Sequence, residues 1–146
     1  MSYNKLAVAI EVLTYVAMNS GEHPASSKII CKELGLKLRY TETLMQAFVK
    51  AGILKSIRGV AGGYSLGRDR RRIDLAEVNE IVISLQNSIN KKPDNSTLSM
   101  VSGSIISDIE NSITQTLQKI TLEEIYDKAV KLKMTDGKTK KTDFVI

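Results

Sequence analysis

Residues 44 to 66 decide the fold, and they read LMQAFVKAGILKSIRGVAGGYSL. The first part has the apolar spacing of an amphipathic helix and stops at Ala51 and Gly52, because a helix C-terminus favours a glycine with positive φ. Two short apolar runs follow, 53–57 and 64–66, and the glycines between them permit the tight turn of a hairpin. The order of helix, strand, turn and strand predicts the second half of a winged helix-turn-helix.

The tip of the predicted hairpin carries a single cationic side chain. Arg58 precedes Gly59 and is surrounded by short residues, so its guanidinium is expected to project and to reach a DNA groove beside the preceding helix. The glycines at 59–63 lack the Gly-Lys-Ser/Thr ending and the strand-before-helix context of a phosphate-binding loop. A hairpin turn is therefore the expected structure.

Three helices are predicted before the hairpin. Residues 3–19 have apolar side chains on two faces, which either the core or a second subunit must cover. A short second helix, capped by Ser26 or Ser27, ends before Gly35. Its expected inward residues are Ile29, Ile30 and Leu34. The expected inward residues of the third helix are Leu38, Thr41, Leu44 or Met45, and Phe48.

The opposite face of the third helix is polar. Its residues are Arg39, Glu42, Thr43, Gln46 and Lys50, flanked by Tyr40. Arginine suits the edge of guanine, glutamine that of adenine, and glutamate accepts a hydrogen bond from cytosine. Taken alone, such a face is more typical of a helix that meets only solvent.

Charge is unevenly distributed along the 146 residues. Residues 1–72 contain 12 basic and 5 acidic side chains, for a net charge of +7. Residues 73–130 have a net charge of −5 and residues 131–146 a net charge of +3. The basic block coincides with the predicted helix-turn-helix, which favours a polyanionic partner over a merely solvated surface.

The remainder of the chain predicts a mainly α fold in which the hairpin wing is the one β element. Residues 1–85 are expected to form the winged helix-turn-helix domain. Its last helix is predicted to begin at a capping box made by Asp74 and Glu77. Residues 86–99 are polar and are expected to be a loop. Residues 100–130 are expected to hold a long helix and a short one capped at Thr121, and residues 131–146 a basic flexible tail.

The long helix carries an apolar seam. Its residues recur every three or four positions, at Leu98, Val101, Ile105, Ile109, Ile113, Leu117 and Ile120. Such a seam requires a partner helix, and a coiled-coil-like pairing of two chains is expected, with the first helix packed alongside. The predicted dimerisation residues are Val101, Ile105, Ile109, Ile113 and Leu117.

The sequence offers no catalytic or metal-binding constellation. His23 is the only histidine and Cys31 the only cysteine, so no set of neighbouring ligands or catalytic partners can be assembled. A surface position is expected for His23 and a buried, inert one for Cys31. We expect no enzyme, no disulfide, no cofactor and no membrane span, and the cytosol as compartment.

The segment 36–68 resembles the Rrf-type family of bacterial winged helix-turn-helix transcriptional regulators. The motifs of that family correspond here to Tyr40-Thr41-Glu42, to Ala51-Gly52-Ile53 and to residues 56–66, SIRGVAGGYSL. Looser similarity covers the rest of the chain except the basic tail, including Ile73-Asp74-Leu75 and Ile120-Thr121-Leu122.

The resemblance implies a homodimeric regulator, expected to be a repressor, that places two winged domains on the half-sites of a palindrome in double-stranded DNA. One recognition helix would enter each major groove, and Arg58, presented by Gly59, would enter the minor groove. The side chains expected to read or orient bases are Arg39, Tyr40, Glu42 and Gln46. Those expected to hold phosphates are Ser27, Lys28, Lys37 and Lys50.

One family feature is missing from this sequence. Members that sense iron, nitric oxide or redox state hold a cluster on three cysteines before the long helix, and residues 86–103 contain none. The resemblance therefore implies a regulator without a cluster. The candidates for its control are a partner protein, a small ligand in the dimer crevice and the Cys31 thiol. The alternative function is a winged-helix module that binds proteins instead of DNA.

Overall fold

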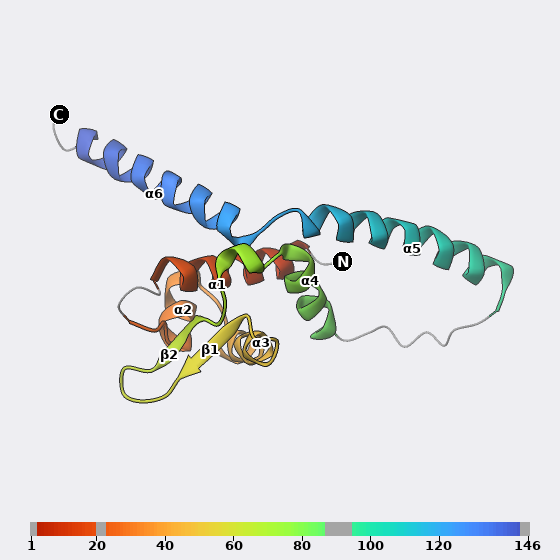
Figure 1. Ribbon diagram of the computed structural model, residues 1–146, viewed down its shortest axis with the longest axis horizontal. Helices are drawn as coiled ribbons and strands as arrows, with labels where there is room; N and C mark the ends of the chain where they lie inside the picture. Colours follow the sequence, from red (N-terminus) through yellow and green to blue (C-terminus); the bar gives the residue numbers. More distant parts are fainter. Residues whose placement is uncertain (1–2, 20–22, 87–94, 144–146) are drawn as a thin grey trace.

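The computed structural model describes residues 3–19, 23–86 and 95–143. The elements are α1 (Tyr3–Asn19), α2 (Ser27–Leu34), α3 (Leu38–Lys50), β1 (Leu54–Ile57), β2 (Gly63–Leu66), the 3-10 turn η1 (Arg70–Arg72), α4 (Leu75–Ser84), α5 (Thr97–Gln118) and α6 (Leu122–Asp143). In Figure 1, α3 and the hairpin lie on one side of the molecule, whereas α5 and α6 run along the other. The predicted mainly helical fold with a β-hairpin wing is confirmed.

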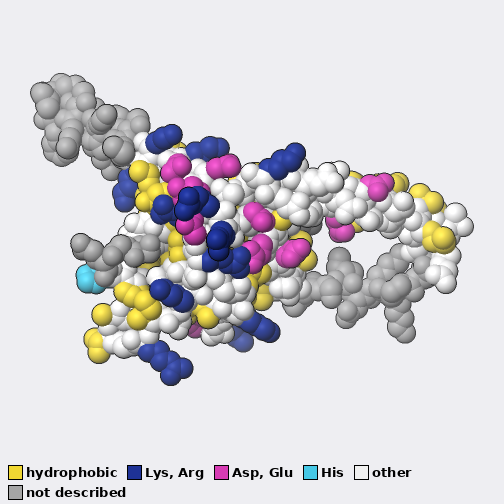
Figure 2. Space-filling view, in the orientation of Figure 1, with side chains coloured by type: hydrophobic (Ala, Val, Ile, Leu, Met, Phe, Trp, Pro, Cys, Tyr) yellow, Lys and Arg dark blue, Asp and Glu magenta, His cyan; other side chains and the backbone are white. Residues whose placement is uncertain are grey.

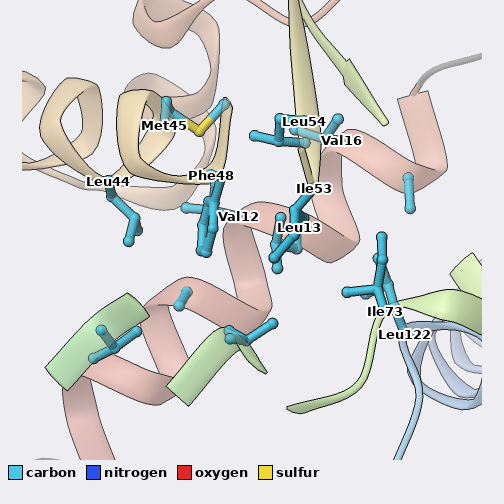
Figure 3. Close-up of a cluster of buried hydrophobic side chains, with 14 of the residues drawn as sticks. Val12, Leu13, Val16, Leu44, Met45, Phe48, Ile53, Leu54, Ile73 and Leu122 are labelled. Carbon is cyan, nitrogen blue, oxygen red and sulfur yellow. The ribbon is translucent and has the colours of Figure 1, made fainter. Parts of the chain in front are cut away.

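The core is built around α1. Val12, Leu13 and Val16 are fully buried, and Figure 3 shows them meeting side chains of α3 and β1 together with Ile73 and Leu122. Helix α1 packs against α2, α4, α6 and β2, so elements of its own chain cover most of its surface. The core of the same chain thus supplies one of the two coverings expected for this helix.

The glycines predicted to end helices do so with a left-handed backbone. Gly35 follows α2 with φ 65° and Gly52 follows α3 with φ 78°. The N-terminus of α2 is capped by Ser26, whose Oγ accepts a hydrogen bond from the backbone N–H of Ile29 at 3.3 Å. These local signals were readable from the sequence because each depends on only a few neighbouring residues.

Two residues predicted to face the core do not. Ile29 is 50% exposed, because the face of the short helix α2 that packs against the core carries Ile30 and, partly buried, Leu34. Leu38 is 41% exposed, because it opens α3 one turn before the helix reaches the core. The other expected inward residues of α3, including both Leu44 and Met45, are buried.

The wing is an antiparallel hairpin in which Leu54 pairs with Leu66 and Ile57 with Gly63. Ala25 extends it on the other side of β2, since the N–H of Ala25 donates to the carbonyl of Tyr64 at 3.0 Å and the N–H of Tyr64 donates back at 2.8 Å. A side chain at Gly63 would place Cβ 2.6 Å from the backbone of Ala25. The glycine thus permits the close approach that joins the wing to the segment before α2.

A backbone bridge ties the segment after the wing to the start of α6. The N–H of Leu75 donates to the carbonyl of Ile120 at 2.9 Å, and the N–H of Leu122 donates to that of Ile73 at 2.8 Å. Asp74 caps α4 as predicted, its Oδ1 accepting from the N–H of Glu77 at 3.0 Å. The bridge places the buried Leu122 against the core.

The C-terminal helices differ from the prediction in their bounds. Helix α5 begins at Thr97, inside the expected loop, because Ser96 caps it by accepting from the N–H of Ser99 at 3.2 Å. Helix α6 continues to Asp143, well beyond the expected end near Val130 and into the expected tail. That segment contains no proline to stop a helix. Most of the predicted loop, residues 87–94, lies outside the described residues.

We expect Gly63→Ala to lower the free energy of unfolding by about 1–3 kcal/mol, since its Cβ would push the wing away from Ala25. Gly103→Ala is the matched control. No atom lies within 4 Å of a Cβ at this helical position, so it should raise stability by about 0.5–1 kcal/mol. Urea unfolding followed by circular dichroism measures both. Equal effects of the two variants would contradict the close approach at Gly63.

Candidate nucleic-acid interface

The rotation of α3 about its axis is fixed by the side chains that it buries. Thr41, Leu44, Met45 and Phe48 are all fully buried against the core. Thr41 remains satisfied there because its Oγ1 donates to the carbonyl of Lys37 at 2.9 Å. The face that remains exposed carries Arg39, Glu42, Thr43, Gln46 and Lys50.

The N-terminal end of α3 adds a lysine and a tyrosine to the candidate interface. Lys37 is exposed at the N-cap position, and its side chain makes no capping hydrogen bond. Tyr40 is half-buried and packs against the core, and this burial raises the pKa of its phenol. The phenol is therefore neutral at physiological pH and its hydroxyl can donate a hydrogen bond.

Two further predicted phosphate contacts lie at the start of α2. Ser27 is the first residue of this helix and is half-buried, and Lys28 follows it and is exposed. Helices α2 and α3 pack against each other. The side chains predicted to hold phosphates therefore come from two adjacent helices.

The tip of the wing projects beyond the body of the protein. Arg58, Gly59 and Val60 are exposed, and Gly59 adopts φ 123°, which favours glycine. The N–H of Gly62 donates to the carbonyl of Gly59 at 3.0 Å and closes the turn. Figure 1 shows the tip on the same side of the molecule as α3. In Figure 2, lysine and arginine side chains occur along this lower edge, and most acidic ones lie above it.

The basic run at 68–72 belongs to the basic block of residues 1–72, but three of its arginines form ion pairs within the protein. Arg68 makes a two-pronged ion pair with Glu77, with nitrogen–oxygen distances of 2.6 and 2.9 Å. The same guanidinium donates to the carbonyls of Ala51 at 2.9 Å and of Arg72 at 3.2 Å. It thereby joins the end of α3, the segment after β2 and the first turn of α4.

Two more arginines of the run have partners. The Nε of Arg70 donates to Glu123 at 2.6 Å, which raises the pKa of Arg70, and its guanidinium lies 3.6 Å from the ring centre of Tyr126. Arg71 pairs with Asp69 at 2.9 Å, and its hydrogen bonds hold the pKa of that carboxyl well below the usual range. Sequence reasoning missed the role of Arg70, because Arg70 and Glu123 are 53 positions apart.

The structure places the candidate residues for other chemistry apart from one another. His23 is exposed, as predicted, and Cys31 on α2 is half-buried, less buried than predicted. Among the described residues, no three histidine, cysteine or acidic side chains are grouped so that they could hold a metal ion. In the same part of the chain, the helices are too short or too polar to cross a membrane.

Comparison with known proteins agrees with this geometry. The family model Rrf2, described as an iron-dependent transcriptional regulator, matches residues 3–128. The transcriptional regulator IscR of Xenorhabdus nematophila is 32% identical over 120 residues, which is 80% of this chain and 73% of that protein.

Solved structures show the same relationship. IscR of T. potens superposes with a TM-score of 0.68 at 32% identity and covers 88% of each chain. CymR of B. subtilis, described as a global cysteine regulator, has a TM-score of 0.66 at 24% identity, covers 87% of this chain and 96% of its own, and shares the fold. These relatives are regulators and not enzymes. The chain therefore belongs to the Rrf2 family of winged-helix transcriptional regulators.

Proposed function

We propose that this protein is a homodimeric repressor that binds a palindromic operator in the cytoplasm and carries no iron–sulfur cluster. The observation that carries the proposal is that the exposed polar side chains of α3 and the exposed Arg58 belong to two elements, α3 and the hairpin, that lie on the same side of the molecule (Figure 1). A helix and a guanidinium on one side of a winged domain can enter adjacent grooves of one duplex. Repression then requires only that the bound dimer overlap a promoter.

The proposed contacts follow from exposure and chemistry. Arg39, Glu42 and Gln46 would read bases in the major groove, with Tyr40 orienting them or donating to a phosphate. The phosphate contacts would come from Ser27, Lys28, Lys37 and Lys50. Arg58, presented by Gly59, would enter the minor groove. The carboxylate of Glu42 repels phosphates, so its place on this face favours a role in sequence discrimination.

Selection of bound sites from random DNA, followed by shift assays at several salt concentrations, tests the proposal. We expect one enriched palindrome and an affinity that falls steeply as salt rises, because phosphate contacts release counterions. A protein-interaction module would enrich no sequence. Weak binding that salt abolishes, without any sequence preference, would contradict the proposal as well.

Arg58→Ala is expected to weaken binding to the selected operator by about 1–3 kcal/mol, since a groove contact is lost. Thermal stability should be unchanged, because Arg58 is exposed at the wing tip. Arg71→Ala is the matched control, because it removes the same charge from an exposed side chain that is paired with Asp69 away from the wing. Equal losses of affinity in the two variants would show only a general charge effect.

The proposed dimer rests on α5. None of its 22 residues is buried, and the apolar side chains of Val101 and Ile105 are 53% and 54% exposed. A helix that leaves its apolar residues in solvent requires a partner surface. Farther along the predicted seam, Leu117 packs against the core of its own chain, while Ile109 and Ile113 face α4. We therefore assign the centre of the interface to Leu98, Val101 and Ile105.

Ile105→Glu is expected to yield monomers that no longer bind the operator, because the charge would be buried against the second copy. Ser107→Glu is the control, since it adds the same charge at an exposed position on the other side of α5. Light scattering gives the mass of each variant. A dimeric Ile105→Glu protein that still binds DNA would place the interface elsewhere.

Because the family is described as iron-dependent, the side chains of this protein must be compared with those that an iron–sulfur cluster requires. A sulfur-ligated cluster needs several thiolates, and the chain contains only Cys31, on α2. Among the described residues, no other group of ligating side chains could replace them. The donor set does not fit a cluster held within one subunit, which supports the cluster-free part of the proposal.

We expect the protein to be colourless and to bind its operator equally well after aerobic or anaerobic purification. Visible absorbance from bound iron and sulfide would contradict this expectation. Because Cys31 is only half-buried, peroxide treatment of the parent and of Cys31→Ser tests the thiol alternative. Loss of DNA binding in the parent alone would establish a thiol switch, and equal responses would eliminate it.

A further inference from the structure

Thr43 lies in the middle of the exposed face of α3. Arg39 precedes it by four positions, and Gln46 and Lys50 follow it by three and seven. At this spacing the four side chains form one stripe along the helix, opposite the residues that α3 buries. The other three members of the stripe are long and polar. Thr43 is the short one, and it stands at the centre of the face proposed to enter the major groove.

The hydroxyl group of Thr43 is engaged within its own helix. Its Oγ1 donates to the carbonyl oxygen of Arg39 at 3.0 Å. A threonine hydroxyl has a single proton, so Thr43 has none left to donate to a base or a phosphate. The other group on its Cβ is the methyl. Because the hydroxyl is held against the backbone and the residue is exposed, the methyl is the group that Thr43 presents to a partner.

Thymine is the base that offers an apolar group in the major groove. Adenine, guanine and cytosine present hydrogen-bond donors and acceptors there, whereas thymine adds a C5-methyl group beside its O4 acceptor. A methyl pressed against a hydrogen-bonding edge would take water from that edge without replacing the hydrogen bond, which is unfavourable. Contact between two methyl groups removes apolar surface from water on both sides and is favourable.

We propose that Thr43 is a specificity-determining residue that selects a thymine in each half-site of the operator, through contact between its methyl group and the C5-methyl of the base. This inference rests on the proposed function. Thr43 is about 6 Å along the helix axis from Arg39 and about 4.5 Å from Gln46. Base pairs are stacked about 3.4 Å apart, so the selected thymine lies within about two base pairs of those that Arg39 and Gln46 contact.

The operator obtained by site selection tests this assignment, because single methyl groups can be removed from it. Each thymine of a half-site is replaced in turn by deoxyuridine, which lacks the C5-methyl and is otherwise the same base, with the matching change in the other half-site. Shift assays then give the affinity of the full-length protein for each duplex. We expect one position at which deoxyuridine weakens binding about threefold to tenfold.

Two substitutions separate the methyl group of Thr43 from its hydroxyl. Thr43→Ser removes the methyl and keeps the hydroxyl, so it should bind the thymine operator about threefold to tenfold more weakly and no longer distinguish deoxyuridine from thymine. Thr43→Val keeps a methyl in a side chain of the same shape, which has one strongly preferred rotamer in a helix. It should distinguish the two bases as the parent does.

Thr116→Ser is the matched control. Thr116 is exposed on α5, and its Oγ1 makes the same kind of bond, to the carbonyl of Ser112 at 3.0 Å. This variant also loses one methyl group from a helix surface, but away from α3. It should bind the operator as the parent does and remain sensitive to deoxyuridine. Thermal unfolding of all three variants should match that of the parent, because both positions are exposed.

A half-site in which no thymine responds to deoxyuridine overturns the proposal, and so does a Thr43→Ser protein that remains as sensitive as the parent. Full affinity in Thr43→Ser with a loss in Thr43→Val would mean that the hydroxyl oxygen accepts from adenine or cytosine, which overturns it too. These results leave the proposed function standing, since each requires a selected operator. Failure to enrich any sequence would refute the proposed function, and the role of Thr43 with it.

Discussion

Burial of one face of α3 is the constraint on which the candidate interface depends. Four consecutive inward positions of this helix are completely excluded from solvent, so the helix cannot rotate without exposing Phe48 or burying Arg39. The polar face is therefore presented in one orientation. Leu54 at the start of β1 is buried in the same core, so the wing and α3 are anchored by one set of packed side chains. Their relative placement follows from packing and not from the polar residues themselves.

A second constraint acts through Arg68. Its guanidinium donates hydrogen bonds to the carbonyl of Ala51 at the end of α3 and to the carboxylate of Glu77 in α4. Because the donors of a guanidinium lie in one plane at fixed angles, these hydrogen bonds restrict the distance and the angle between α3 and α4. Three of the four arginines at 68–72 are committed to such contacts. The charge of this run consequently overstates what the protein offers to a polyanion, and the cations on α2, α3 and the wing tip are the relevant ones.

Helices α4, α5 and α6 connect the winged domain to the proposed dimer seam. Arg70 joins η1 to α6 through Glu123 and Tyr126, and the bridge at Leu75 and Leu122 joins α4 to the same helix. Helix α5, in contrast, meets its own chain chiefly along α4. Helix α6 is therefore tied to the winged domain by polar contacts, whereas the position of α5 depends mainly on its packing against α4.

The sequence by itself determined the features that depend on neighbouring residues. The helices of the winged domain, the serine cap of α2, the aspartate cap of α4, the left-handed Gly52 after α3 and the hairpin with Arg58 at its tip were predicted, because each is fixed within a few positions. Only the tertiary structure decided which cations are paired and which part of the α5 seam remains exposed. These outcomes depend on contacts between distant segments, such as Arg70 with Glu123, and periodicity carries no information about which helix lies opposite.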